Sequence, residues 1–391
     1  MKTIVLASAG ILGSASFAAQ AQSSVALYGV IDAGISYVNH SNLNNSAGSN
    51  SLVKFDDGVA QGNRWGVRGS EDLGGGVRAI FNLENGFSVG SGALNQGGRE
   101  FGRQAFAGLS KSGVGSLTFG RQYSLSQDSL APFSDGGQTV ANNYAYHIAD
   151  VDQLTASRVD NAVKFKSASY AGLTFGALYG FSNQAGAFAG TPASSASGGS
   201  GRTYSVGVHY VNGPFAAGAA LTDERYPGAT NYPSPTAFSN VNPAKLTSTI
   251  QEFRTFGVGS SYQMGAATIW CLYSNTRFVP VTGTTTTFDA YDLGVKYSFT
   301  KSMIAGLGYT YMHASSNDMV GHWNQVNTSV DYSFSKTTDV YLLGIYQAAS
   351  GHVGNRPLQA TIGSSQTAYL GASGPDASSQ LAMRVGIRHK F

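Results

Sequence analysis

The sequence predicts an all-β fold, a 16-stranded antiparallel transmembrane β-barrel, from its composition, its residue alternation and the lengths of its connections. The chain has 391 residues, of which 12% are charged, about half the usual share of roughly 25%. It contains 51 glycines, 21 tyrosines and 21 phenylalanines. This composition is typical of a chain with many strands that turn one face toward lipid. After the N-terminus, no run reaches the ~18 apolar residues of a membrane-spanning helix.

The first 21 residues predict a cleaved signal peptide. Lys2 is followed by a short apolar run at residues 4–12 and by Ala19-Gln20-Ala21, an A-x-A cleavage site. The run is too short to cross a bilayer as a helix. We therefore expect an exported protein with two regions, the signal peptide at residues 1–21 and one transmembrane barrel domain at residues 22–391.

Strands are predicted wherever apolar and polar residues alternate. In residues 77–87, for example, Val77 and Phe81 share one face, whereas Arg78 and Glu84 share the other. About sixteen segments qualify, and single-chain bacterial barrels use even numbers of strands. The predicted strands are residues 24–38, 64–70, 77–87, 101–110, 116–121, 158–167, 173–181, 204–210, 215–221, 253–262, 267–273, 291–299, 303–311, 326–334, 340–346 and 381–391.

The connections between these segments alternate between short and long. Membrane barrels have short periplasmic turns and long extracellular loops, so both chain ends are expected on the periplasmic side. The third long connection, residues 121–158, is predicted to fold into the pore and narrow it. Short connections are residues 71–76, 111–115, 211–214, 263–266, 300–302 and 335–337, and the other long ones are residues 39–61, 88–98, 183–201, 222–250, 274–287, 313–323 and 347–379.

Several motifs resemble the Gram-negative general porins of the β-proteobacterial and neisserial type. They are SSVALYGVIDAGISY, NRWGVRGSEDLGGGVRAIFNLENGF, FGRQAFAGLSKSGVGSLTFGRQY, RVDNAVKF and the terminal VGIRHKF. The resemblance covers the whole mature chain. It implies a homotrimer of sixteen-stranded barrels in the cell outer membrane, with the third extracellular loop folded inward as a constriction. The expected partners are outer-membrane lipid, lipopolysaccharide and the barrel assembly machinery, which would recognise the aromatic terminus Phe391.

The resemblance also implies the residues of the pore constriction. The family places an arginine cluster on the barrel wall, opposite acidic groups on or near the third loop. The loop tip here reads Ala131-Pro132-Phe133, without the acidic residue that stands next to the proline in some enterobacterial relatives. The matching wall residues are Arg64, Arg103, Arg158 and Glu84, and the available loop carboxylates are Asp128 and Asp135.

The charges on the lumen side of the predicted strands favour anions, because a ring of one sign biases ion passage. We therefore expect a water-filled channel for ions and small hydrophilic solutes with a mild anion preference. A substrate-specific channel for sugars or organic anions is the alternative. The charges counted are Arg64, Arg68, Arg78, Arg103, Arg158, Lys164 and Lys166 against Glu84, Asp128, Asp135 and Asp160.

Other functions find little support in the sequence. It contains no H-E-x-x-H, C-x-x-C or P-loop pattern, so we expect neither an enzyme nor a bound cofactor. A net charge of only +3 indicates no nucleic-acid partner. Cys271 has no second cysteine to pair with and is expected to be a small side chain on a strand. Ala26, Gly29 and Ala33 are small residues that could pack against a neighbouring subunit or against lipid.

Overall fold

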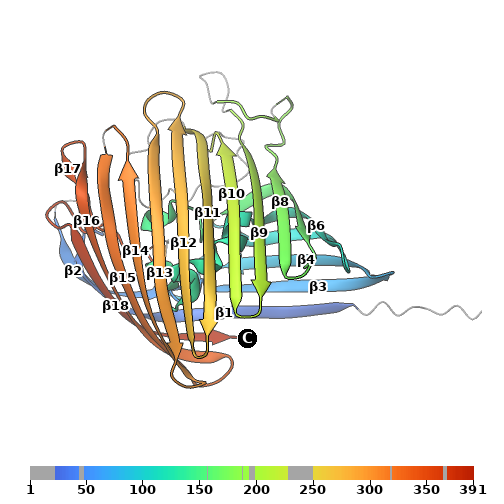
Figure 1. Cartoon of the computed structure of the whole chain (residues 1–391), viewed down its shortest axis with the longest axis horizontal. Helices are drawn as coiled ribbons and strands as arrows, with labels where there is room; N and C mark the ends of the chain where they lie inside the picture. Colours follow the sequence, from blue (N-terminus) through green and yellow to red (C-terminus); the bar gives the residue numbers. More distant parts are fainter. Residues whose placement is uncertain are drawn as a thin grey trace, which may run out of the picture.

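The strands form one continuous antiparallel sheet in a computed structural model, which describes residues 23–43, 48–155, 157–186, 188–192, 199–227, 250–317, 319–363 and 368–391 (Figure 1). The predicted signal peptide lies outside these ranges. The strands are β1 Ser24–Ser41, β2 Asn50–Asp57, β3 Arg64–Gly74, β4 Val77–Gly86, β5 Gln104–Lys111, β6 Gly115–Tyr123, β7 Arg158–Ser167, β8 Leu173–Gly180, β9 Arg202–Asn212, β10 Phe215–Arg225, β11 Ile250–Met264, β12 Ala267–Pro280, β13 Thr286–Ser298, β14 Met303–Ser315, β15 Met319–Ser333, β16 Thr338–Val353, β17 Arg356–Pro357 and β18 Ser379–Lys390.

The sheet closes on itself, because β1 pairs with β18 on one side and with β2 and β3 on the other. β2 and β3 pair with different halves of β1 and so act as one interrupted strand. β17 has two residues and only extends the end of β16. The described residues form eighteen strands, and counting β2 with β3 and omitting β17 leaves sixteen around the ring. The predicted closed 16-stranded antiparallel barrel is confirmed.

Several predicted loops are partly strand. Residues 39–61 contain β2, and the expected loops at residues 274–287 and 313–323 shrink to residues 281–285 and 316–318 between paired strands. Thr, Ser and Asn interrupt the apolar residues in these segments, so the segments were read as connections. Backbone pairing continues through them, and they still present apolar side chains, such as exposed Val53 and Phe55 on β2 and buried Phe278 on β12.

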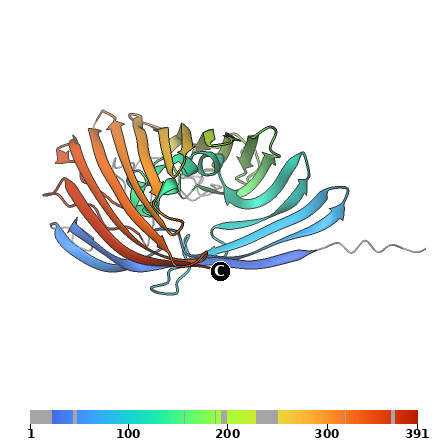
Figure 2. The same ribbon diagram turned by 60° about the horizontal axis from the view of Figure 1, so that its bottom comes forward.

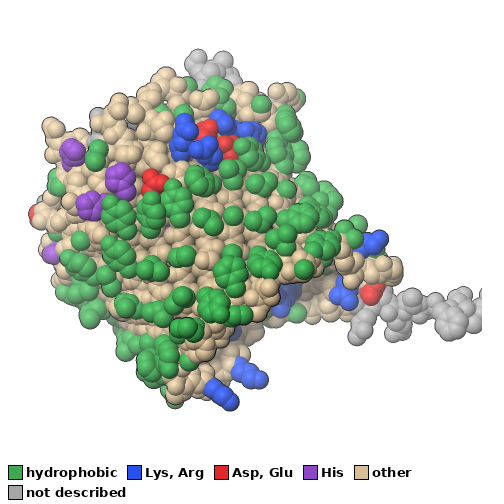
Figure 3. All heavy atoms as spheres, viewed as in Figure 1, with side chains coloured by type: hydrophobic (Ala, Val, Ile, Leu, Met, Phe, Trp, Pro, Cys, Tyr) green, Lys and Arg blue, Asp and Glu red, His purple; other side chains and the backbone are tan. Residues whose placement is uncertain are grey.

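The outward face of the barrel carries an apolar belt (Figure 3). Ile35, Val385 and Leu342 are exposed, and they stand side by side on β1, β18 and β16 because Ile35 pairs with Val385 and Val385 with Leu342. An exposed apolar surface shared by neighbouring strands is the lipid-facing surface of a membrane barrel.

Among the described residues, no helix is long and apolar enough to cross a membrane.

Residues 124–157, named here the inner loop, carry short helices that lie within the ring of strands (Figure 2). The loop packs closely on the inner wall at glycine positions, where the wall has no side chain. A Cβ added to Gly218 on β10 would lie 2.2 Å from the carbonyl oxygen of Ser129, and one added to Gly308 on β14 would lie 2.2 Å from Asp135 Oδ2. The helices are α1 Leu125–Ser129, η1 Ala131–Phe133, α2 Asp135–Gln138, α3 Asn142–Ala145 and η2 Ile148–Asp150.

The inner loop is held at several points along its length. The Leu125 amide donates to Ser205 Oγ on β9 at 2.9 Å, and the hydroxyls of Ser126 and Thr222 on β10 lie 2.7 Å apart. Farther along, the Asn143 amide donates to the Val59 carbonyl at 3.0 Å, and the Tyr144 hydroxyl reaches Ser36 on β1 at 2.7 Å. The loop is therefore fastened to walls on different sides of the lumen.

Candidate functional site

Three arginines and one glutamate gather on the inner wall formed by β3 to β7. Arg64 begins β3, Glu84 lies near the end of β4, Arg103 directly precedes β5, and Arg158 begins β7. Arg103 Nε donates to Glu84 Oε1 at 2.7 Å, and Arg64 Nε lies 3.7 Å from Glu84 Oε2. The structure thus brings together the four wall residues predicted from the sequence, which we name the wall cluster.

Two tyrosines complete the wall cluster, and the sequence analysis did not assign them to it. The Arg158 guanidinium lies over the ring of Tyr123, 5.0 Å from its centroid. The Tyr28 hydroxyl donates to Glu84 Oε2 at 2.8 Å. Tyr28 alternates with outward-facing Val25 and Leu27 on β1, so period-2 alternation could have placed it on the lumen side.

Positive charge exceeds negative charge in the wall cluster. Three guanidinium groups stand against one carboxylate, which Arg64 and Arg103 contact while Arg158 lies over Tyr123. Arginine remains charged at every working pH. The side chains of Arg64 and Arg103 keep 19% and 12% of their surface exposed, against 6% for Glu84. Low-dielectric walls focus the field of such groups into the lumen beyond contact distance.

The two loop carboxylates lie apart from each other, each with partners of its own. Asp128 Oδ2 accepts from Lys164 Nζ at 2.6 Å, on the β7 side of the lumen. Asp135 sits against β12 to β15, where its oxygens accept from Trp270 Nε1 at 2.6 Å and from Asn327 Nδ2 at 2.7 Å. These contacts bring neither carboxylate to the three arginines.

Asp135 belongs to a buried polar network that joins the inner loop to the wall. Its amide donates to Asp292 Oδ2 at 3.0 Å, and His147 lies between Asp292 and Asp152, with ring nitrogens 3.0 Å and 2.5 Å from their carboxylate oxygens. Burial and the neighbouring Asp292 raise the pKa of Asp135 to about 7. Burial alone would lower the pKa of His147, but the carboxylates of Asp152 and Asp292 raise it well above its ordinary value.

Two of the other predicted lumen charges, Arg68 and Asp160, lie on β3 and β7, the strands that also carry Arg64 and Arg158. Arg68 lies over the Tyr28 ring, 5.0 Å from its centroid. Asp160 accepts from Arg99 Nη1 at 2.7 Å and also bonds Arg121. Because Asp160 is engaged by two cations, it offers little negative charge to set against the wall cluster.

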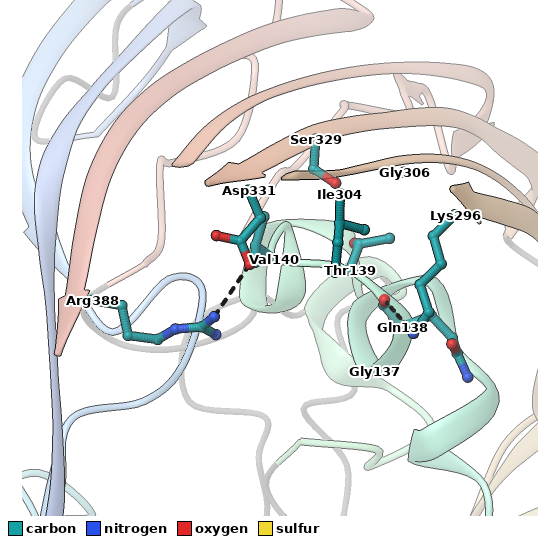
Figure 4. Close-up of a pocket in the computed structure, with 10 residues that line it drawn as sticks. All are labelled: Gly137, Gln138, Thr139, Val140, Lys296, Ile304, Gly306, Ser329, Asp331 and Arg388. Atoms are coloured by element: carbon teal, nitrogen blue, oxygen red, sulfur yellow. Dashed lines mark hydrogen bonds and ion pairs between the residues drawn. The ribbon is translucent and has the colours of Figure 1, made fainter. Parts of the chain in front are cut away.

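A pocket of about 220 Å³ lies between the inner loop and the wall, toward the ends of β13 to β15 that carry the short turns (Figure 4). Arg388 Nη2 and Asp331 Oδ2 approach to 3.5 Å on one side, and Lys296 Nζ donates to the Gln138 carbonyl at 3.3 Å on the other. It is lined by Gly137, Gln138, Thr139, Val140, Lys296, Ile304, Gly306, Ser329, Asp331 and Arg388. Charged groups therefore also border the path below the inner loop.

The terminal residue Phe391 pairs with β1. The Gly29 amide donates to the Phe391 carbonyl at 2.9 Å, and a Cβ on Gly29 would lie 2.2 Å from the Phe391 ring. The space left by Gly29 is thus filled by the chain's own terminus.

A closed barrel with an apolar outer belt, a charged inner wall and a loop folded into its lumen defines a membrane channel. The family model described as Gram-negative porin matches residues 5–350. An outer membrane porin protein of Bordetella pertussis is 31% identical over the full length of both chains. The chain therefore belongs to the Gram-negative porin family and is an outer-membrane protein, which confirms the resemblance seen in the sequence.

Solved structures support the fold. The anion-selective porin from Comamonas acidovorans superposes with a TM-score of 0.69 at 22% identity, covering 95% of this chain and 100% of the other. A trimer form of OmpT of Vibrio cholerae reaches a TM-score of 0.63 at 18% identity, covering 94% and 99%.

Proposed function

We propose that this porin is a general diffusion channel with a mild anion preference, whose constriction is formed by Arg64, Arg103, Arg158 and Glu84 facing the inner loop. The observation that carries the proposal is the charge of the wall cluster, where three guanidinium groups stand against the single carboxylate of Glu84. Passing anions are stabilised by the excess charge and passing cations are repelled. The anion selectivity of the Comamonas acidovorans porin is consistent with the same preference.

The two loop carboxylates act in this proposal by holding the constriction in place. Asp128 pairs with Lys164 and so fastens the first turn of the loop to β7. Asp135 fastens the loop to the opposite wall through Trp270 and Asn327. Neither has to contact the arginines in order to set the pore's width and charge.

Liposome swelling distinguishes the general pore from the substrate-specific alternative. Proteoliposomes holding the refolded protein are diluted into a series of neutral sugars of increasing size. A smooth fall of swelling rate with size supports general diffusion, whereas one sugar that enters far faster than others of its size would contradict it. A series of organic anions of graded size tests the organic-anion form of the alternative in the same way.

We further propose a homotrimer in the outer membrane, with the signal peptide removed after Ala21. The trimer form of the Vibrio cholerae protein supports the first proposal, and Ala33 on the outer face of β1 offers room for a neighbour. Light scattering on the detergent-solubilised protein tests the trimer, and N-terminal sequencing of the mature chain tests the cleavage after Ala21.

The terminal residue Phe391 is proposed to be recognised by the barrel assembly machinery, so its deletion should lower the amount of protein found in the membrane. We propose no enzymatic activity and no cofactor.

A further inference from the structure

Three histidines gather on the outer face of the barrel, near the ends of β14 to β16 that carry the long connections. They are His313 on β14, His322 on β15 and His352 on β16, which stands diagonally from His322 because its direct partner is Val320. Figure 3 shows histidine side chains grouped over the upper part of these strands, beside an acidic side chain. Histidine is the commonest metal ligand in proteins.

His313 and His322 stand directly opposite each other on neighbouring strands. The β14–β15 register pairs His313 with His322, and the β13–β14 register pairs His313 with Asp289. The two histidines alternate with buried side chains that face the lumen, such as Met312 and Trp323, so both lie on the outer face. Three neighbouring strands therefore place three metal-ligating side chains in one outward-facing row.

The spacing of a cross-strand pair suits two imidazoles that hold one ion between them. Residues directly opposite each other in an antiparallel pair have Cβ atoms about 4.5–5.5 Å apart. A zinc ion binds an imidazole nitrogen at about 2.0–2.1 Å, so two nitrogens on one tetrahedral ion lie roughly 3.4 Å apart. Because each ring swings over the space between the strands as its side chain rotates, both rings can reach one ion without movement of the backbone.

The two rings are available to a ligand, and their backbones are fixed. Within the part of the chain that the structure describes, the ring nitrogens of His313 and His322 form no hydrogen bond. The ring of His322 lies 5.8 Å from that of Tyr311. His322 also pairs with Ser350 on β16, so its strand is held on both sides. Sites built on strands hold their ligands more precisely than sites built on loops.

The row lies at the watery edge of the lipid-facing surface. Tyr291 and Tyr311 pair with each other one row closer to the middle of the barrel. Tyrosines on the outer face mark the interface between lipid and water in a membrane barrel. Rows on one face of a strand are about 7 Å apart, so the two imidazoles stand about that far beyond the tyrosines. Metal ions dissolved in the external water therefore reach them without crossing lipid.

The charge next to the pair favours a cation. Asp289, the neighbour of His313 on β13, accepts from Tyr273 and Asn275 through Oδ1, each at 2.8 Å. These neutral donors leave the carboxylate its negative charge, which attracts a cation. Arg277 on β12 lies two strands away from His313, opposite Thr287.

The protein offers two ligands to such an ion. Among the described residues, no three metal-ligating side chains already converge on one point. We propose that His313 and His322 bind one divalent transition-metal ion between their imidazole nitrogens, with water completing its coordination and Asp289 attracting it. Imidazole suits Zn²⁺, Ni²⁺ and Cu²⁺, whereas Mg²⁺ and Ca²⁺ prefer oxygen ligands.

The test measures Zn²⁺ binding to the refolded mature protein, without an added histidine tag, by isothermal titration calorimetry in detergent. One ion per chain is expected, and excess Mg²⁺ should not displace it. His322→Gln should weaken binding at least about tenfold, because a single imidazole lacks the second point of attachment. The matched control His389→Gln removes an exposed histidine that stands opposite Ile31 and Thr338, and it should leave the affinity unchanged.

A site that needs both imidazoles also predicts how the substitutions combine. His313→Gln and the double variant should each bind Zn²⁺ as weakly as His322→Gln, because each change breaks the same site. Losses that add, an unchanged affinity in His322→Gln, displacement by Mg²⁺, or an equal loss in the control would overturn the proposal. Parental single-channel conductance confirms that each variant is folded, since the row lies outside the lumen. If His322→Gln does not fold, His313→Gln serves in its place with the same expected loss.

Discussion

Arg103 donates its Nε proton to Glu84 Oε1 at 2.7 Å, so the single carboxylate of the wall cluster is already engaged by an arginine. Arg64 approaches the other oxygen of the same carboxylate to 3.7 Å. Glu84 therefore orients the arginines and reduces their charge without cancelling it. This relationship predicts how the channel responds when the carboxylate is neutralised.

Replacing Glu84 by Gln should strengthen the anion preference. The amide keeps the shape of the side chain and can still accept from Arg103, but the negative charge is lost. We expect the chloride-to-potassium permeability ratio to rise roughly twofold, since one charge of a small cluster is removed. Reversal potentials in planar bilayers measure the ratio. An unchanged ratio would show that Glu84 does not contribute to the field in the ion path, and Lys336→Gln in an exposed turn is the control.

Protonation of Asp135 should hold the inner loop more firmly at acidic pH. Burial and Asp292 raise its pKa to about 7, above the value of about 4 in the unfolded chain. The stabilisation is therefore complete below about pH 4 and is lost as the pH rises through about 7. The raised pKa of His147 acts with the same sign, and its contribution is lost only as the pH rises above that raised pKa.

Single-channel recording tests whether the ionisation of Asp135 loosens the inner loop. Open-channel current noise should increase between about pH 5 and about pH 8, as the loop loosens. Asp135→Asn cannot ionise, so its noise should change less over the same range. The same pH dependence of the noise in this variant and in the parent protein would show that the ionisation of Asp135 does not loosen the inner loop.

A larger side chain at Gly218 should displace the inner loop. The first atom added there would lie 2.2 Å from the Ser129 carbonyl oxygen, and overpacking of this kind typically costs about 1–3 kcal/mol. Gly218→Val is therefore expected to change single-channel conductance and to lower thermal stability. Ala219→Val adds methyl groups to the lipid-facing side of the same strand, and it should leave conductance unchanged. Parental conductance in Gly218→Val would contradict the observed loop position.

The sequence predicted the barrel and the wall cluster for different reasons. Alternation identified the strands, because lipid on one side and the lumen on the other impose a period of two. Arg64, Arg103, Arg158 and Glu84 were found through motifs resembling a family, and the structure brings them together. β2 was not predicted, because residues 39–61 were read as one long connection. The ends of β12 to β15 that face the long connections were likewise assigned to loops.

The partners of the loop carboxylates could not have been predicted in the same way. Asp135 meets Trp270 and Asn327, which lie 135 and 192 residues farther along the chain. Such contacts depend on how far the loop extends across the lumen and on the register of distant strands. Nothing in the residues next to Asp135 encodes either quantity.

The reversal potential of the refolded protein in a planar bilayer under a KCl gradient tests the central claim most directly. The excess of arginine in the wall cluster predicts a potential on the anion-selective side, and Arg103→Glu should shift it toward cations. A clear cation preference in the parent protein, or no shift on replacing Arg103, would contradict the proposal that this cluster sets the selectivity of the pore.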